Sequence, residues 1–498
     1  MWPRFGVKVG NSTLCIAHVK ADGKAEVIAN KQGDRVSQAC LLWDGEKEIE
    51  CGLTAKQKMA SRPKQGVANS FQMLLPEDSL KEKLETCAKD IPCEYDSTIH
   101  KFILRSKIPG EDDEKENTKQ LNVFDIHMHL FKAELELARQ FHSDIEQKPI
   151  VVLSIPSYYP DKARELLAQS AEDAGFHVAQ IISEPSAALL AYSIGETDIS
   201  SESKYILAVK SGGLFSHIAL YQVRNGFYTQ LDSYGPFPIG GKQFSEALVQ
   251  FICEEFQRKY KLDPHESRRS IAKIRNAAMN CKHILTTLPS TQIYIDSLMD
   301  GIDYSSQMSR ARFESLIQPV ISTFMQTLSE CVEKSINEHS NIKINAIVLL
   351  GATMQIPKLQ SAIAALFPDA MLYNTLSTDE VVALGCARQA TFLVDADEQE
   401  LDITENSHFA EDRITIWHND EADAKILIEK GTMLPNATKI DIQVGKDIEN
   451  ITLKWRLGEN EVNETSVIKP TDEGLLQFEA DTYYNDESKS SVIMLNCL

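Results

Sequence analysis

The sequence lacks several features that would place the chain in a special class of protein. It has no run of 18 uninterrupted apolar residues, so we expect no membrane-spanning helix. Its 10 cysteines form no CxxC pair and no Cys/His spacing typical of zinc sites, and scattered thiols indicate a reducing compartment. The first residues, MWPRFGVKVG, run directly into an alternating strand pattern without an apolar signal core. We therefore expect a cytosolic protein.

Positive charge is also scarce. The chain carries 51 Lys and Arg against 72 Asp and Glu, a net charge of −21. From Asp395 to the end, 24 acidic and 9 basic residues give −15, so the first 394 residues carry only −6. Because an acidic surface repels a phosphate backbone, we expect no direct binding to nucleic acid. The acidic C-terminal part is predicted to be a solvated module.

The 498 residues are enough for two or three domains. Residues 1–394 mix alternating strands with long amphipathic helices, which predicts an α/β domain. Residues 395–406 are acidic and weakly apolar, which is typical of a linker. Residues 407–498 contain short alternating strands at close spacing, which predicts a small all-β domain.

A weak internal repeat lies within the large domain. FGVKVGNSTLCIAHV (5–19) and ILAVKSGGLFSHIALYQV (206–223) both read as apolar strand, lysine, glycine-containing turn and apolar strand. Such a hairpin tip exposes successive backbone N–H groups, which can cradle a phosphate. Two further glycine sites follow at 240–241 and 350–353. This pattern predicts two related lobes that face a shared cleft.

Longer segments carry a family resemblance. They are VVLSIPSYYPDKARELLAQSAEDAGFHVAQIISEPSAALLAYSIG (151–195), FPIGGKQF (237–244), TQIYIDSLMDGIDYSSQMSRARFESL (291–316) and IVLLGATMQIPKLQ (347–360). The chain resembles the 70-kDa heat-shock chaperone family over nearly its whole length. The resemblance implies an actin-like ATPase domain of two lobes, followed by a β-sandwich of the substrate-binding type. The helical lid that the family places next is expected to be missing.

The resemblance also implies catalytic positions, and this sequence departs from them. Lys8 and Lys210 stand where the family has aspartates that serve Mg²⁺. His217 replaces a third aspartate, and Phe71 aligns with the catalytic lysine. Lysine offers only hydrogen-bond donors, whereas Mg²⁺ needs oxygen ligands, so no metal site is expected. Since each lost catalytic group costs about 10²–10⁴-fold, we expect little or no ATP hydrolysis. Two acidic family positions are retained, Glu184 and Asp379.

The nucleotide pocket keeps more of the family pattern. Met279 replaces a glutamate that would bind ribose, His283 replaces an arginine that stacks on adenine, and Gln355 replaces another arginine. The cleft is expected to accept ATP, with its affinity left open. The positions that the resemblance assigns to nucleotide binding are Gly10, Asn11, Ser12, Thr13, Gly212, Gly213, Gly240, Gly241, Lys282, His283, Thr286, Gly351, Ala352 and Thr353.

Two interpretations of Lys8 and Lys210 remain open. In the first, their ammonium groups replace Mg²⁺ and neutralise the ATP phosphates directly. In the second, they pair with Glu184 and Asp379 and close an empty site. The linker also departs from the family, because Glu398–Asp402 keeps one leucine, Leu401, instead of several. At roughly 1.5–3 kcal/mol per buried leucine, docking of the linker would lose several kcal/mol, so ATP-driven peptide release is not expected.

Within the family, the chain is most similar to the divergent lidless branch, which pairs with a J-domain protein in a ribosome-associated complex. This implies an atypical chaperone or co-chaperone that binds ATP and reaches ribosomes and nascent chains through that partner. The alternative is an active ATP-dependent chaperone whose catalytic groups have moved. A third hypothesis, a sugar-kinase or actin relative, conflicts with the β module and with the heat-shock motifs.

Overall fold

The chain divides into two compact units, Met1–Thr404 and Glu405–Leu498, in a computed structural model. The linker residues Glu398, Leu401 and Asp402 lie outside the described residues. The structure describes residues 4–20, 22–30, 32–59, 61–75, 93–96, 98–107, 116–142, 148–195, 203–224, 226–339, 342–393, 408–409, 414–417, 425–428, 433–434, 436–443, 450–457, 463–468, 475–485 and 490–497.

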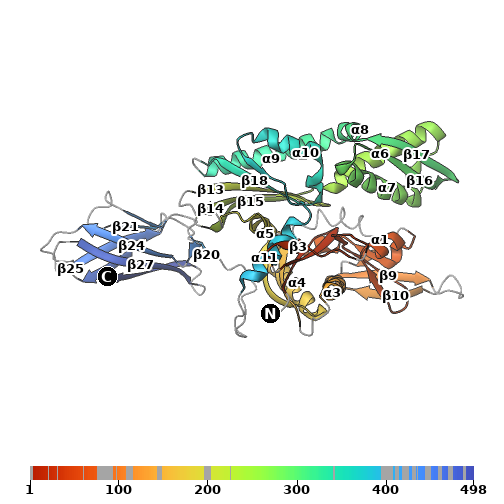
Figure 1. Cartoon of the computed structure of the whole chain (residues 1–498). Helices are drawn as coiled ribbons and strands as arrows, with labels where there is room; N and C mark the ends of the chain where they lie inside the picture. The colour runs from red at the N-terminus through yellow and green to blue at the C-terminus, as the bar shows by residue number, and fades with distance from the viewer. Residues whose placement is uncertain are drawn as a thin grey trace. The chain divides into compact units, whose positions relative to one another are not determined.

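The first unit contains two lobes, each built on a mixed sheet (Figure 1). Lobe I has the sheet order β12 (His177–Ser183), β11 (Ile150–Ile155), β1 (Arg4–Val9), β2 (Thr13–Val19) and β3 (Ala25–Val27), with β4 (Ser37–Gln38) beside β2. Strands β1 and β11 are parallel and almost fully buried, and most of their residues are apolar. Helices α3 (Val123–Phe141) and α4 (Asp161–Ala174) pack against each other in this lobe.

A smaller subdomain extends lobe I. It contains α1 (Leu53–Met59), the 3₁₀ helix η2 (Ser70–Leu74) and two three-stranded sheets. One sheet has the order β6 (Ile49–Cys51), β5 (Cys40–Trp43) and β7 (Gly66–Ala68), and the other has the order β10 (Glu116–Leu121), β9 (Lys101–Lys107) and β8 (Glu94–Asp96).

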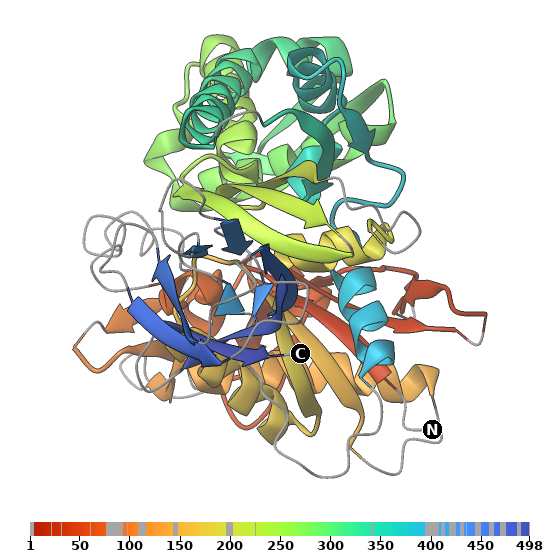
Figure 2. The ribbon, with the colours of Figure 1, turned by 90° about the vertical axis from the view of Figure 1, so that its left-hand side faces the viewer.

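Lobe II repeats the hairpin-based sheet. Its order is β15 (Phe227–Phe237), β14 (Ser216–Arg224), β13 (Lys204–Ser211), β18 (Ile344–Leu350) and β19 (Met371–Tyr373). The helices of this lobe, with the β16 (Ser290–Met299) and β17 (Ile302–Ser309) hairpin, surround a large apolar core. The helices are α6 (Gly241–Tyr260), α7 (Arg268–Thr287), α8 (Arg310–Leu316), α9 (Gln318–Glu338) and α10 (Pro357–Leu366). Figure 2 shows lobe II above lobe I.

Two helices join the lobes, α5 (Glu184–Ala191) and α11 (Val381–Phe392). A Cβ added at Gly385 of α11 would overlap the backbone of Ala187 in α5, so this close crossing requires glycine. The buried residues of both helices share one core with β13, β14 and β18. This crossing therefore connects the two lobes through a shared core.

The second unit consists of antiparallel strands. One sheet has the order β22 (Lys425–Ile428), β21 (Ile414–Trp417), β25 (Asn450–Leu457) and β26 (Asn463–Ile468). The other sheet has the order β24 (Asn436–Gln443), β27 (Leu475–Asn485) and β28 (Ser490–Cys497), and β20 (His408–Phe409) pairs with β23 (Met433–Leu434). An α/β domain followed by a small all-β domain confirms the predicted fold class. In the parts of the chain that are described, no helix combines the length and the apolar composition needed to cross a bilayer.

Helix α3 carries a buried carboxyl group. Asn122 and Asp125 form a capping box that begins the helix, and its inner face includes Glu134, which is 2% exposed. Burial raises the pKa of Glu134 to about 7, although a hydrogen bond with Ser37 partly offsets that rise. The folded state therefore favours the protonated carboxylic acid, whereas the unfolded chain ionises near the ordinary value.

This pKa difference predicts a pH-dependent loss of stability. Between the unfolded pKa and about pH 7, the folded chain holds a proton that the unfolded chain releases, so stability falls as pH rises. We expect Glu134→Gln to remove this dependence and to gain up to roughly 3 kcal/mol relative to the native chain at pH 8, but little at pH 4. Thermal unfolding at both pH values measures the gain, with the exposed Glu136→Gln on the same helix as control. An equal effect of Glu134→Gln on stability at both pH values would contradict a raised pKa for Glu134 in the folded chain.

Candidate functional site

A cleft of about 1820 Å³ lies between the two lobes of the first unit. This is larger than the roughly 300–1,000 Å³ of most small-molecule sites. Thirteen of the fourteen residues predicted to bind nucleotide line it, and the exception, Gly240, is the N-cap of α6 beside Gly241. The structure therefore brings together residues that are up to about 340 positions apart in the sequence. Their contact with a nucleotide stays a prediction.

The loops of lobe II hold one another in place at the floor of the cleft. Gly241 and Lys242, at the start of α6, donate their backbone N–H groups to the carbonyls of Gly212 and Gly213, both at 2.8 Å. Thr353 Oγ1 also donates to Gly212 O at 2.8 Å. This network fixes the β13–β14 turn before any ligand enters.

A third loop contributes Gly351 to the same floor. Its φ of 89° lies in the left-handed region, and an added Cβ would overlap Ser211 O, so only glycine fits. The residues that follow form the 3₁₀ helix η5 (Ala352–Gln355), which aims Thr353 at the β13–β14 turn.

A buried ion pair lies in the wall of the cleft. Lys210, on β13, donates from Nζ to Glu184 Oε2 at the first residue of α5. The Glu184 side chain is 1% exposed and that of Lys210 is 13% exposed. Burial lowers the pKa of Lys210, while the Glu184 carboxylate raises it and the nearby Lys8 lowers it further. The second oxygen of Glu184, Oε1, is buried and has no hydrogen-bond partner among the described residues.

Lys8 approaches the same region from lobe I. Its side chain is buried, and its Nζ donates to Thr13 Oγ1 across the β1–β2 hairpin at 3.0 Å. Because Lys8 lowers the pKa of Lys210, the two ammonium groups lie near enough to repel each other. Two lysines therefore line the cleft from opposite lobes, and one carboxylate, that of Glu184, is bound to Lys210.

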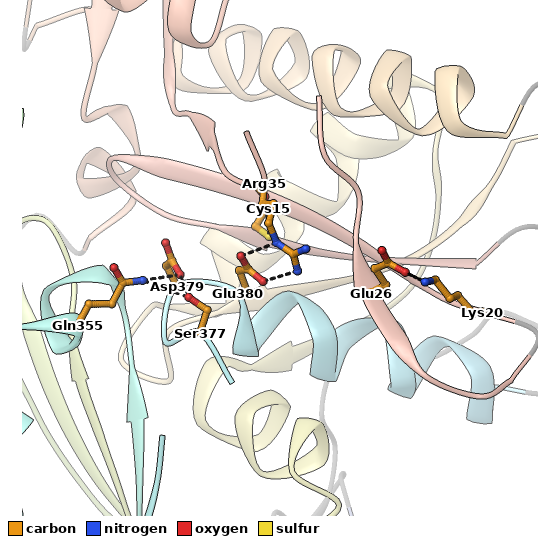
Figure 3. Close-up of polar contacts among 8 residues, drawn as sticks. All are labelled: Cys15, Lys20, Glu26, Arg35, Gln355, Ser377, Asp379 and Glu380. Atoms are coloured by element: carbon orange, nitrogen blue, oxygen red, sulfur yellow. Dashed lines mark hydrogen bonds and ion pairs between the residues drawn. The ribbon is translucent and has the colours of Figure 1, made fainter. Parts of the chain in front are cut away.

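Asp379 does not pair with Lys8 in the described part of the chain. Its Oδ1 accepts hydrogen bonds from Gln355 Nε2 at 2.9 Å and Ser377 Oγ at 2.6 Å (Figure 3). The next residue, Glu380, accepts two hydrogen bonds from Arg35, at 2.8 and 2.7 Å. Of the contacts that the second interpretation supposes, the structure contains Lys210 with Glu184, whereas Asp379 has other partners.

Two further positions that the family resemblance assigns to catalysis, Phe71 and His217, carry no charge. Phe71, in η2, is 2% exposed and stacks on Tyr159 at a centroid distance of 4.8 Å. His217 is buried and its Nε2 forms a 2.8 Å hydrogen bond with Ser233 Oγ. Burial lowers the pKa of His217 to about 3, with a contribution from Lys210. Phe71 cannot act as a cation and His217 is uncharged at neutral pH. Neither His217 nor Asp379 is among the residues that line the cleft.

The side of the cleft predicted for adenosine is formed by α7 and α1. Lys282 Nζ donates to Gly241 O at 2.7 Å, and burial, helped by Lys56, lowers the pKa of Lys282 to about 8. Burial likewise lowers the pKa of His283 to about 4, so its imidazole is neutral at pH 7. Thr286 Oγ1 donates to the carbonyl of His283 at 2.7 Å. A neutral ring can still stack on a base, but it offers no cation for that contact.

Sequence reasoning missed Lys56. It lies on α1 and donates from Nζ to Gln38 Oε1 at 2.6 Å, close to Met279 Sδ at 3.7 Å. Burial lowers its pKa. No local motif marks Lys56, because only the folded subdomain brings α1 next to α7.

The cleft has the opposite charge balance from the whole chain. Eleven lysines and arginines line it, against three glutamates, in a chain of net charge −21. A cleft lined by one sign of charge attracts ligands of the other sign. The basic residues are Lys8, Lys56, Lys64, Arg105, Lys210, Lys242, Arg268, Arg269, Lys273, Arg275 and Lys282.

The donor set does not fit Mg²⁺. The ion prefers six oxygen ligands, usually from one or two carboxylates together with waters and phosphates. Here Glu184 is bound by Lys210, Asp379 is bound by Gln355 and Ser377, and Lys8 presents an ammonium group. The chemistry of this cleft suits an anion and not a divalent cation.

Comparisons with known proteins agree with this architecture. The family model described as "Hsp70 protein" matches residues 4–442. "Heat shock 70 kDa protein 14" of Bos taurus is 32% identical over 456 residues, which is 90% of this chain and 86% of that protein. The Homo sapiens protein of the same name is 32% identical over 454 residues, with the same shares, and "Heat shock 70 kDa protein 14-B" of Xenopus laevis is 32% identical over 455 residues.

The buried ion pair predicts an asymmetric response to mutation. Lys210→Met leaves the Glu184 carboxylate buried without its counter-ion, which should cost roughly 3–5 kcal/mol of unfolding free energy. Lys210→Met combined with Glu184→Leu removes both charges and should recover most of that loss. Urea unfolding followed by circular dichroism measures the three proteins. If the single variant proved as stable as the native chain, Glu184 would not depend on Lys210.

Proposed function

The chain belongs to the Hsp70 family, and from that premise we propose that it is a chaperone or co-chaperone subunit that binds ATP and hydrolyses it weakly or not at all. The observation that carries the proposal is the Lys210–Glu184 ion pair, which places a cation where the family resemblance expects a metal-serving carboxylate. The apolar Phe71 and the neutral His217 support it, because neither supplies the charge that phosphoryl transfer needs.

In this proposal, the cations of the cleft neutralise the triphosphate. Lys8 faces it from lobe I, the Lys210–Glu184 pair lies on the cleft wall as well, and Lys282 and Lys56 add charge on the α7 side. The glycine loops supply close backbone approach, and Thr13 and Thr353 supply hydroxyl groups. ATP then acts as a ligand that holds the two lobes together, and binding does not depend on magnesium.

Titration of ATP by calorimetry, with excess Mg²⁺ and again with EDTA, tests this. We expect dissociation constants that agree within about threefold, since the neutralising charges belong to the protein. Lys8→Ala should weaken binding by about tenfold or more, because a hydrogen bond to a charged group contributes about 1.5–3 kcal/mol. Lys343→Ala, an exposed lysine outside the cleft, is the matched control and should have no effect. Binding that disappears with EDTA would contradict the proposal.

We further propose that the chain acts in the cytosol with a J-domain partner on newly made polypeptides at the ribosome. Its similarity to the lidless branch supports this role, and its charge of −21 supports attachment through the partner, because ribosomal RNA repels an acidic chain. The acidic C-terminal strands would face the same repulsion.

Sedimentation through a sucrose cushion tests the attachment. The purified chain should stay in the supernatant when mixed with ribosomes alone and should pellet with them when the J-domain partner is added. The assay is run at low ionic strength, because added salt would screen the repulsion that is expected to prevent direct binding. Pelleting with ribosomes in the absence of the partner would refute indirect attachment.

A further inference from the structure

Three metal-ligating side chains meet in lobe II, outside the cleft. Asp232 lies on the edge strand β15, Glu338 is the last residue of α9, and His339 is the C-cap of that helix. Their ligand atoms all lie within 4.8 Å of one another. His339 Nε2 is 3.1 Å from each carboxylate oxygen of Asp232. None of the three lines the cleft, so this cluster is independent of the proposed function.

Neighbouring contacts hold the two elements together at this point. Tyr234 follows Asp232 by two positions, so the two side chains lie on the same face of β15. The hydroxyl of Tyr234 is 3.0 Å from Ser335 Oγ, one turn before Glu338. Ser335 itself is buried, which fixes the last turn of α9 against the strand. The ligands therefore come from a rigid junction and not from a loose loop.

The electrostatics of the junction favour a cation. Asp232 is only 11% exposed and its Oδ2 is buried. The C-terminus of α9 adds the negative end of a helix dipole, and its last turn contains no basic residue. Lys334 is 3.7 Å from Glu338, but both side chains are at least half exposed, and such surface pairs contribute little. Within the described residues, the two carboxylates and the helix C-terminus thus have only the exposed ammonium group of Lys334 to offset part of their negative charge.

The types of ligand in this cluster indicate which metal ion it would bind. One imidazole nitrogen and two carboxylate oxygens form a three-residue set that suits Zn²⁺, with a fourth position for water. Imidazole disfavours Mg²⁺ and Ca²⁺, which prefer oxygen ligands alone. We propose that Asp232, Glu338 and His339 bind one Zn²⁺, which fastens the end of α9 to the edge of the lobe II sheet. Glu338, half exposed on a long side chain, provides the movement needed to close the set around the ion.

Zinc titration of the EDTA-treated full chain, followed by calorimetry, tests the proposal. We expect one equivalent to bind, and we expect His339→Ala and Glu338→Gln each to weaken binding by at least about 10-fold, the smallest loss typical when metal sites are disturbed. Zinc should raise the melting temperature of the native chain but not that of Glu338→Gln. This exposed substitution should leave the melting temperature in EDTA unchanged, which separates loss of binding from misfolding.

A matched control and a spectroscopic probe make the result decisive. His265 is 2.8 Å from Asp263 and forms an exposed His–Asp pair that belongs to no three-residue cluster of the described chain, so His265→Ala should bind zinc as the native chain does. Co²⁺ in place of zinc should give d–d absorption without thiolate charge transfer, which excludes the cysteines as ligands. Thiolate charge transfer, unchanged binding by His339→Ala, or no zinc binding at all would overturn the proposal.

Discussion

The cleft depends on one electrostatic constraint, the buried contact between Lys210 and Glu184. Glu184 is 1% exposed, so its carboxylate needs a partner, and Lys210 supplies it from the neighbouring strand. A buried charge without a partner is costly, so neither residue can change alone. Because the charge of Lys210 is bound to Glu184, Lys8 is the cation that the β1–β2 hairpin of lobe I presents to the cleft.

The scaffold explains why this pair is so well buried. Helices α5 and α11 cross at Gly385 with no room for a side chain, and α5 begins at Glu184. The crossing also fixes β13, on which Lys210 lies, against the same core. The floor of the cleft is similarly preorganised by the hydrogen bonds among the turn after β13, α6 and η5. A preorganised cleft lined by more cations than anions suits an anionic ligand.

Much of this was accessible from the sequence, because it depends on periodicity and on glycine. The two hairpins with glycine tips predicted two lobes, and the short alternating strands after residue 407 predicted the β domain. Side-chain pairing was less predictable, since it depends on distances across the fold. One of the two open interpretations paired the lysines with Glu184 and Asp379, but Asp379 is bound by Gln355 and Ser377. Lys56 and the cluster at His339 have no sequence motif, because their partners come from separate elements.

The central claim is that a folded, ligand-binding cleft has replaced a catalytic one, and a single-turnover assay tests it most directly. The native chain, in excess over radiolabelled ATP, is incubated with Mg²⁺ and then with an added J-domain protein, and phosphate release is followed. The account predicts that the bound nucleotide releases phosphate slowly or not at all, and that the J-domain protein does not accelerate the release. Rapid release that requires Mg²⁺ and is stimulated by the J-domain protein would contradict it and would favour relocated catalytic groups.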